Sequence, residues 1–217
     1  MRRFPYTSVA DFKIFRKLNS PSKIQDFLNT IPHNFESREV YLSPLMVLKK
    51  NKAHCMEGAL LASAIFWFHS KKSFIVNLSP TTDDLDHVIT LFRENRHWGA
   101  VSKTNHVVLR YRDPVYETPH ELVMSYFNEY FLDDGKKTLR SYSELIDMTT
   151  VDNPWVTTEE NIIDIVYLLN ETPHIDILRG LNPRRLRPAD KIEVRAFIPT
   201  EWKKLHKKKK TKKTSKK

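Results

Sequence analysis

The chain has 217 residues, of which 40% are hydrophobic and 11% aromatic, a composition that is typical of a folded domain and excludes a disordered or fibrous chain. Its net charge is +10 at pH 7, and its single cysteine excludes an intrachain disulfide. It has no apolar leader and no apolar stretch of about 18 residues, so we expect a cytoplasmic protein without a signal peptide or a membrane span. The length predicts one domain, residues 1–202, with a helical N-terminal part.

The N-terminal third of the chain predicts helices. A stretch from about Ser8 carries Phe12 and Phe15 and favours a first helix. Serine followed by proline occurs at residues 20–21 and again at residues 43–44, and this pair is typical of the cap and first residue of a helix. We therefore expect further helices to begin at these two places.

Residues 55–68 are apolar on nearly every face, which predicts a helix buried in the core. Cys55 is its first residue, where free backbone N–H groups and the positive end of the helix dipole favour a thiolate. The same N–H groups could stabilise an oxyanion. We expect Glu57 to complement the dipole or to lie in the cleft, without a catalytic role, and Gly58 to allow a close approach of another segment.

Three β-strands are predicted after this helix. Residues 73–79 are rich in β-branched and aromatic side chains, and residues 87–93 and 97–102 form a hairpin around the polar turn at 94–96. His87 opens the first hairpin strand. A further strand is expected at residues 106–112, closed by Pro114, which makes the sheet mainly antiparallel.

The last third of the chain mixes helix and strand signals. Helices are predicted at residues 119–130, starting from the Thr118-Pro119 pair, and at residues 158–170, before Pro173. A strand is predicted at residues 191–198. The arginines among residues 179–187, with Arg184, Arg185 and Arg187 at the centre, could bind an anion or simply lie exposed in solvent.

The stretch of residues 43–113 resembles the core of the transglutaminase-like superfamily. The resemblance rests on Cys55 at the start of a buried helix, a strand, His87 at the start of a hairpin, and Trp98 eleven residues later. It implies an α+β fold of the papain or transglutaminase type. In this fold a mainly antiparallel sheet packs on the buried central helix that carries the cysteine.

The superfamily's third catalytic residue is an aspartate four positions after the tryptophan, where this chain has Ser102. A serine can accept the imidazole N–H and orient the ring, but it cannot stabilise an imidazolium by charge. Asn105 is a second candidate for this role. His54 competes with His87 as the base, but adjacent residues at a helix start point in different directions, so we expect His54 to line the site.

The resemblance implies a thiol enzyme that acts on amide or peptide bonds, as a peptidase, an amidase or a transglutaminase-like acyltransferase. Cys55 would be the nucleophile and His87 the base, and the substrate would be a protein, a peptide or a small amide. The alternative is a non-catalytic binding protein with the same scaffold. The sequence has no glycine-rich phosphate loop and no zinc-ligand pattern, so we expect no cofactor and no metal.

Ten lysines lie in residues 203–217, so the positive charge of the chain is concentrated at its C-terminal end. A lysine-rich segment with few apolar residues cannot bury enough surface to fold, which predicts a disordered tail. Such a tail increases solubility or makes weak, unspecific contact with nucleic acid or other polyanions.

Overall fold

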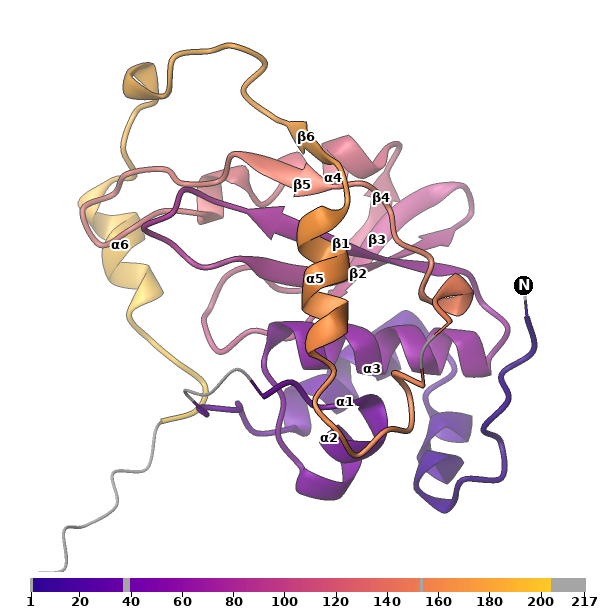
Figure 1. The fold of residues 1–217 in the computed structure, drawn as a ribbon. Helices are drawn as coiled ribbons and strands as arrows, with labels where there is room; N and C mark the ends of the chain where they lie inside the picture. The colour runs from indigo at the N-terminus through magenta and orange to yellow at the C-terminus, as the bar shows by residue number, and fades with distance from the viewer. Residues whose placement is uncertain (1, 37–39, 153, 204–217) are drawn as a thin grey trace, which may run out of the picture.

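In the computed structural model, which describes residues 2–36, 40–152 and 154–203, six strands form one antiparallel sheet in the order β4-β3-β2-β1-β5-β6 (Figure 1). The fold is α+β. The strands are β1 (Ser73–Ser79), β2 (His87–Glu94), β3 (His97–Ser102), β4 (Arg112–Tyr116), β5 (Ser141–Ser143) and β6 (His174–Asp176). The α-helices are α1 (Pro21–Thr30), α2 (Pro44–Lys50), α3 (Cys55–Phe68), α4 (Pro119–Met124), α5 (Ile163–Glu171) and α6 (Lys191–Phe197).

Helix α3 lies at the centre of the larger hydrophobic core. Residues 56–67 of this helix are all buried, in agreement with their nearly continuous apolar character. The helix packs against β1 and β2. The hydroxyl of Thr90 in β2 donates a hydrogen bond of 2.7 Å to the Ala59 carbonyl, and both residues are buried. This bond fixes the helix relative to the sheet that carries His87.

The two faces of the sheet contribute to two different cores. Val88 and Phe92 of β2 belong to the core around α3, whereas Ile89 and Leu91 belong to a second core that includes residues of α4. This alternation is the period-two pattern expected of a strand that is buried on both faces. Figure 1 shows α1, α2 and α3 together on one face of the sheet.

The predicted helix starts at the serine–proline and threonine–proline pairs are confirmed. The hydroxyls of Ser20, Ser43 and Thr118 each accept the backbone N–H three residues further on, at 3.3, 3.3 and 3.1 Å. The first predicted helix is a 3-10 helix, Ala10–Lys17, with Phe12 and Phe15 buried in the core around α3. The N-terminal part is therefore helical, as its sequence indicates.

The strand predicted at residues 106–112 is wrong. Most of these residues lie in a loop that follows β3, and β4 begins only at Arg112. Leu109 has a φ of 57°, a left-handed conformation that interrupts an extended strand. Pro114, which was expected to end a strand, lies inside β4. It is tolerated there because β4 is an edge strand with one side free of ladder hydrogen bonds.

The strand predicted at residues 191–198 is also wrong, because this segment forms α6. Asp190 and Glu193 form a capping box at the start of the helix, and the Asp190 N–H donates to Glu193 at 2.5 Å. An acidic N-cap residue followed three positions later by glutamate is a helix-start signal. Here this local signal outweighs the strand-like alternation of residues that are largely exposed.

The other C-terminal elements differ from the prediction in length. Helix α4 stops at Met124 and is followed by a 3-10 turn, Phe127–Glu129. Helix α5 begins at Ile163, later than its sequence pattern indicates. The short strands β5 and β6 were not predicted, because three residues are too few for a periodic signal.

No helix formed by the described residues has the length and apolar character needed to cross a bilayer. The predicted lysine-rich tail lies, from residue 204 onward, outside the described residues.

Candidate functional site

Cys55 is the first residue of α3, and His54 is the N-cap residue of this helix. The cysteine is half-buried. The backbone N–H groups of the first helical turn have no acceptor within the helix, and the helix dipole is positive at this end. This end of the helix therefore favours a thiolate and can donate hydrogen bonds to a negatively charged oxygen.

Gly58 allows the end of β3 to approach the first turn of α3. A Cβ atom added at Gly58 would lie 2.3 Å from the Cβ of Lys103, too close for two real atoms. Lys103 directly follows Ser102, the last residue of β3, and is 1% exposed. The missing side chain at position 58 therefore lets the strand end that carries Ser102 lie against the helix that carries Cys55.

The ammonium group of Lys103 forms a hydrogen bond in the buried region between β3 and α3. Its Nζ donates to the Ile31 carbonyl at 2.6 Å. Burial lowers the pKa of Lys103 to about 8. The residue thus couples the end of β3 to the segment that follows α1.

His87 and Ser102 are diagonal neighbours on one face of the hairpin, because Ser102 pairs with Ile89, two residues after His87. The Nε2 atom of His87 lies 2.8 Å from the Ser102 hydroxyl oxygen. The single hydroxyl proton of Ser102 is donated to the Leu109 carbonyl at 2.5 Å. The hydroxyl oxygen must therefore accept the N–H of His87 Nε2. This tautomer leaves Nδ1 of His87 without a proton and able to accept one.

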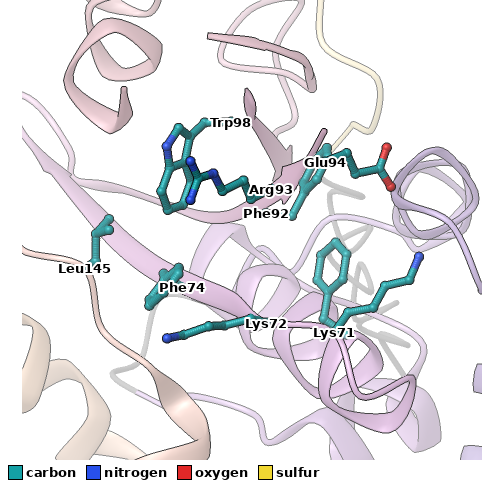
Figure 2. Close-up of a pocket in the computed structure, with 9 residues that line it drawn as sticks. Lys71, Lys72, Phe74, Phe92, Arg93, Glu94, Trp98 and Leu145 are labelled. Atoms are coloured by element: carbon teal, nitrogen blue, oxygen red, sulfur yellow. The ribbon is translucent and has the colours of Figure 1, made fainter. Parts of the chain in front are cut away.

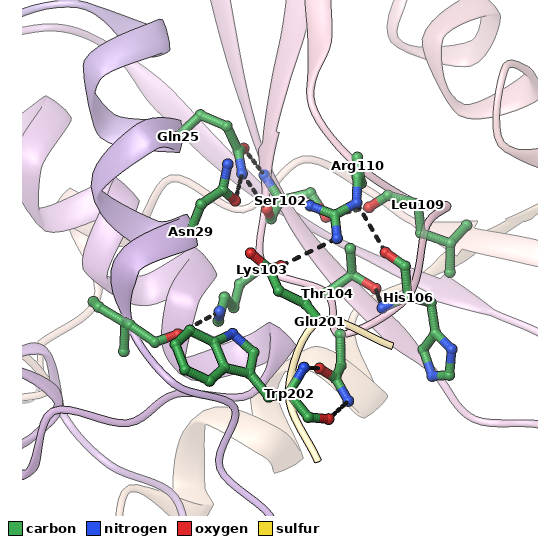
Figure 3. A network of polar contacts seen from close by, with 12 residues as sticks. Gln25, Asn29, Ser102, Lys103, Thr104, His106, Leu109, Arg110, Glu201 and Trp202 are labelled. Atoms are coloured by element: carbon green, nitrogen blue, oxygen red, sulfur yellow. Dashed lines mark hydrogen bonds and ion pairs between the residues drawn. The ribbon is translucent and has the colours of Figure 1, made fainter. Parts of the chain in front are cut away.

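A glutamine of α1 holds Ser102 in place. Gln25 donates from Nε2 to the Ser102 carbonyl at 2.8 Å and accepts the Ser102 N–H at 2.9 Å, as Figure 3 shows. The side-chain amide thus gives Ser102 the pair of bonds that a neighbouring strand would give. The sequence analysis missed Gln25, since it is 77 residues away from Ser102 and no local pattern marks it.

Asn105, the other predicted partner of His87, forms hydrogen bonds with a different residue. Its side chain donates to the Trp202 carbonyl at 3.1 Å and accepts the Trp202 N–H at 2.8 Å. The adjacent ion pair of Arg110 with Glu201, at 3.1 Å, fastens the same C-terminal segment. The structure therefore brings Ser102, and not Asn105, to His87.

Glu57 is fully buried in the first turn of α3. One of its oxygens accepts the Leu42 N–H at 2.9 Å, and the other accepts the His54 N–H at 2.8 Å. The side-chain nitrogen of Asn34 lies 3.2 and 3.1 Å from the two oxygens. The Nε2 atom of His54 is 3.6 Å from Glu57 Oε1. The carboxylate therefore joins three segments of the chain around the residue that precedes the cysteine.

The titration of the site groups follows from these contacts. Burial raises the pKa of the Cys55 thiol, but hydrogen bonds from His54 and His87, together with their charges, hold it well below its ordinary value. Burial lowers the pKa of His54, whereas its hydrogen bond to Cys55 and the charges of Cys55 and Glu57 raise it, and the net shift is upward. Burial and the nearby Lys103 lower the pKa of His33 to about 4.

No family model and no curated protein matches the chain. Among solved structures, the chain is similar to EGTA-treated Legionella pneumophila LapG, at a TM-score of 0.37, and to Legionella pneumophila LapG, at a TM-score of 0.36. Both alignments have 11% identity and cover 48% of this chain. They cover 63% and 64% of LapG, so the match extends over less than two thirds of that protein. This is a weak likeness over about half of the chain.

No group of three or more histidine, cysteine, aspartate or glutamate side chains among the described residues could hold a metal ion. The arginines predicted as an anion site lie at the surface. Arg184 and Arg185 are exposed in a short 3-10 turn, and Arg187 forms an ion pair of 2.7 Å with Asp190.

A hollow of about 590 Å³ lies at the other end of α3 (Figure 2). Aromatic side chains line this hollow. The Lys72 ammonium lies 5.0 Å from the ring centre of Phe74, and the Arg93 guanidinium lies 5.5 Å from the ring centre of Trp98. Phe66 in its wall is about 16 Å along the helix from Cys55, at 1.5 Å per residue. The hollow is therefore separate from the site at Cys55.

Proposed function

We propose that the protein is a transglutaminase-like thiol enzyme that acts on amide or peptide bonds, with Cys55 as the nucleophile and His87 as a base. The main support is a thiol of low pKa at a helix start, next to a histidine whose other ring nitrogen is bound by Ser102. A nucleophile, a base and a residue that orients the base are the three parts that nucleophilic catalysis needs.

In the proposed reaction the Cys55 thiolate attacks the carbonyl carbon, so a C–S bond forms and an electron pair moves to the oxygen. The N–H groups at the start of α3 stabilise this oxyanion. The C–N bond then breaks, and the leaving amine takes the proton that His87 had withdrawn from the Cys55 thiol. Water transfers a proton to Nδ1 of His87 as it attacks the thioester, and the C–S bond breaks. An amine in place of water gives acyl transfer.

Ser102 acts in this proposal as a positioning residue. It accepts the Nε2–H of His87 and so keeps Nδ1 free of a proton and directed to the chemistry. Because Ser102 is neutral, it adds no charge to stabilise a protonated His87.

Electrophilic labelling tests the proposal. Peptide-based probes for cysteine peptidases and amidases should label the wild-type protein on Cys55 and should not label Cys55→Ala. His87→Gln should slow labelling by at least about tenfold, since general acid–base groups contribute at least this much. His97→Gln changes an exposed histidine in the same hairpin and should leave labelling unchanged.

The alternative is a protein that uses the same scaffold only for binding, which the missing aspartate would favour. In that case no probe would label Cys55 beyond the rate of a small free thiol, and His87→Gln would behave like His97→Gln. Either result would reject the proposal that the protein is an enzyme.

A further inference from the structure

The two histidines beside the Cys55 sulfur have partners of different charge. His87 meets the neutral hydroxyl of Ser102, whose own proton is already given to a backbone carbonyl. Asp86 precedes His87, but its carboxylate accepts a hydrogen bond from Asn77 at 2.8 Å. A proton added to Nδ1 of His87 would therefore create a positive charge that faces a neutral partner on Nε2.

His54 instead lies beside a carboxylate. Its Nε2 atom is 3.6 Å from Glu57 Oε1, and its backbone N–H donates to the other oxygen at 2.8 Å. The contacts described for the Glu57 oxygens all come from nitrogen donors, which is the pattern of an ionised carboxylate. A buried negative charge needs a positive partner, and the ring of His54 is the group placed to supply it.

We propose that His54, paired with Glu57, carries a positive charge that stabilises the Cys55 thiolate in the resting protein, beyond the contribution of His87. This inference rests on the proposed function and adds a second histidine to its site. Ser102 does not supply a carboxylate. In this proposal the carboxylate of Glu57 supplies the negative charge, on the other side of the sulfur.

The other groups around His54 are compatible with this charge. The ring of Tyr41 packs edge-on against the imidazole, with ring centres 5.5 Å apart. His33 is also neutral at that pH, because its pKa is about 4. The positive end of the helix dipole opposes a cation at the N-cap. It amounts to about half a unit charge, whereas Glu57 carries a full one and the thiolate adds another.

The rate of Cys55 alkylation by iodoacetamide, measured against pH, tests the proposal. This rate follows the thiolate fraction, and one unit of thiol pKa changes it about tenfold at low pH. At about pH 6, His54→Gln should lower the rate at least about tenfold. Glu57→Gln should lower it in the same direction. His87→Gln should abolish turnover and lower the alkylation rate less than His54→Gln does.

The proposal is overturned if His87→Gln lowers the rate and His54→Gln does not, or if both lower it equally. Nitrogen NMR of the histidine rings in the wild-type protein gives an answer that needs no folded variant. Near neutral pH, His54 should show two protonated nitrogens. A neutral His54 ring would also reject the proposal.

These measurements separate the inference from the proposed function. Thiol alkylation and ring protonation are read without any substrate. If they give the expected results and no amide probe labels Cys55, the charged pair stands and the enzyme proposal fails. If the probes label Cys55 and His54→Gln leaves the alkylation rate unchanged, the enzyme proposal stands and the assignment to His54 fails.

Discussion

The two sides of the Cys55 site are built in different ways. On the helix side, His54 and Glu57 are three residues apart and both belong to the start of α3. On the hairpin side, His87 depends on Ser102, which is held by Gln25 from α1 and by the Leu109 carbonyl from the following loop. The helix side has a buried carboxylate, whereas the hydrogen bonds described for Ser102 on the hairpin side join neutral groups.

This difference indicates a division of tasks between charge and geometry. A carboxylate next to an imidazole stabilises a positive charge, whereas a hydroxyl that accepts an N–H fixes a tautomer. In many enzymes one aspartate does both for a single histidine. Here we expect substitutions on the helix side to change stability and thiol ionisation, and substitutions on the hairpin side to change turnover.

The largest effect on stability is expected for Glu57→Ala. The change leaves the N–H groups of Leu42 and His54 and the side-chain amide of Asn34 without their acceptor. Each unpaired buried donor costs about 1–3 kcal/mol, so the free energy of unfolding in urea should fall by at least about 3 kcal/mol. Glu159→Ala removes an exposed carboxylate and should cost under about 1 kcal/mol. Equal losses for both variants would contradict this prediction.

Gly58→Ala should separate the two sides of the site. The new methyl group would overlap the Cβ of Lys103, and overpacking of this kind typically costs about 1–3 kcal/mol in unfolding free energy. The relevant control is the same change in a Lys103→Gly background, where the overlapping atom is absent. We expect the cost of Gly58→Ala to be smaller there, and an unchanged cost would show that the contact is not the cause.

Ser102→Ala should act on turnover more than on stability. It removes the hydrogen bonds to His87 and to the Leu109 carbonyl, which predicts a loss of about 1–2 kcal/mol in unfolding free energy. The rate of probe labelling should fall by about tenfold, while alkylation at low pH changes little. Ser63→Ala, a buried serine within α3, is the matched control. A large loss of thiolate in Ser102→Ala would contradict the division of tasks.

Low pH should reduce the free energy of unfolding through the protonation of His33, which lies near the helix side of the site. Its pKa is about 4 in the folded protein and about 6.5 in the unfolded chain, so the unfolded chain binds more protons between these values. The contribution is present above about pH 6.5 and is lost as the pH falls to about 4. Because the ring is partly exposed, we expect a loss of about 1 kcal/mol. The difference between the urea stabilities of the wild type and His33→Phe across this range measures it, and parallel curves would refute it.

The parts of the structure set by local patterns were predictable from the sequence. The apolar run of α3 and the hairpin of β2 and β3 follow from their periodicity and turn residues. The family offset that pointed to Ser102 as a partner of His87 agrees with the 2.8 Å contact between their side chains, while the catalytic roles remain a proposal. Glu57 had a local signal as well, a glutamate three residues after an N-cap, but its partners Asn34 and Leu42 lie outside the helix.

The parts set by distant contacts were not predictable. The loop after β3 has strand-like residues, yet Asn105 is bound to Trp202, 97 residues later, and Leu109 turns back toward Ser102. Gln25 lies on a helix whose sequence indicates only amphipathicity. In each case the conformation depends on an acceptor or donor that the chain brings near only after folding.

Strands β1 to β4 are neighbours in the chain as well as in the sheet. Pairings that close short loops form early in folding, and contacts between distant residues form late. The hairpin that carries His87 and Ser102 should therefore form before Gln25, 77 residues away from Ser102, docks on it. During refolding, the circular dichroism of the sheet should recover before Cys55 regains its reactivity at low pH. In a newly folding chain the Cys55 thiol therefore reacts slowly until the last long-range contacts have formed.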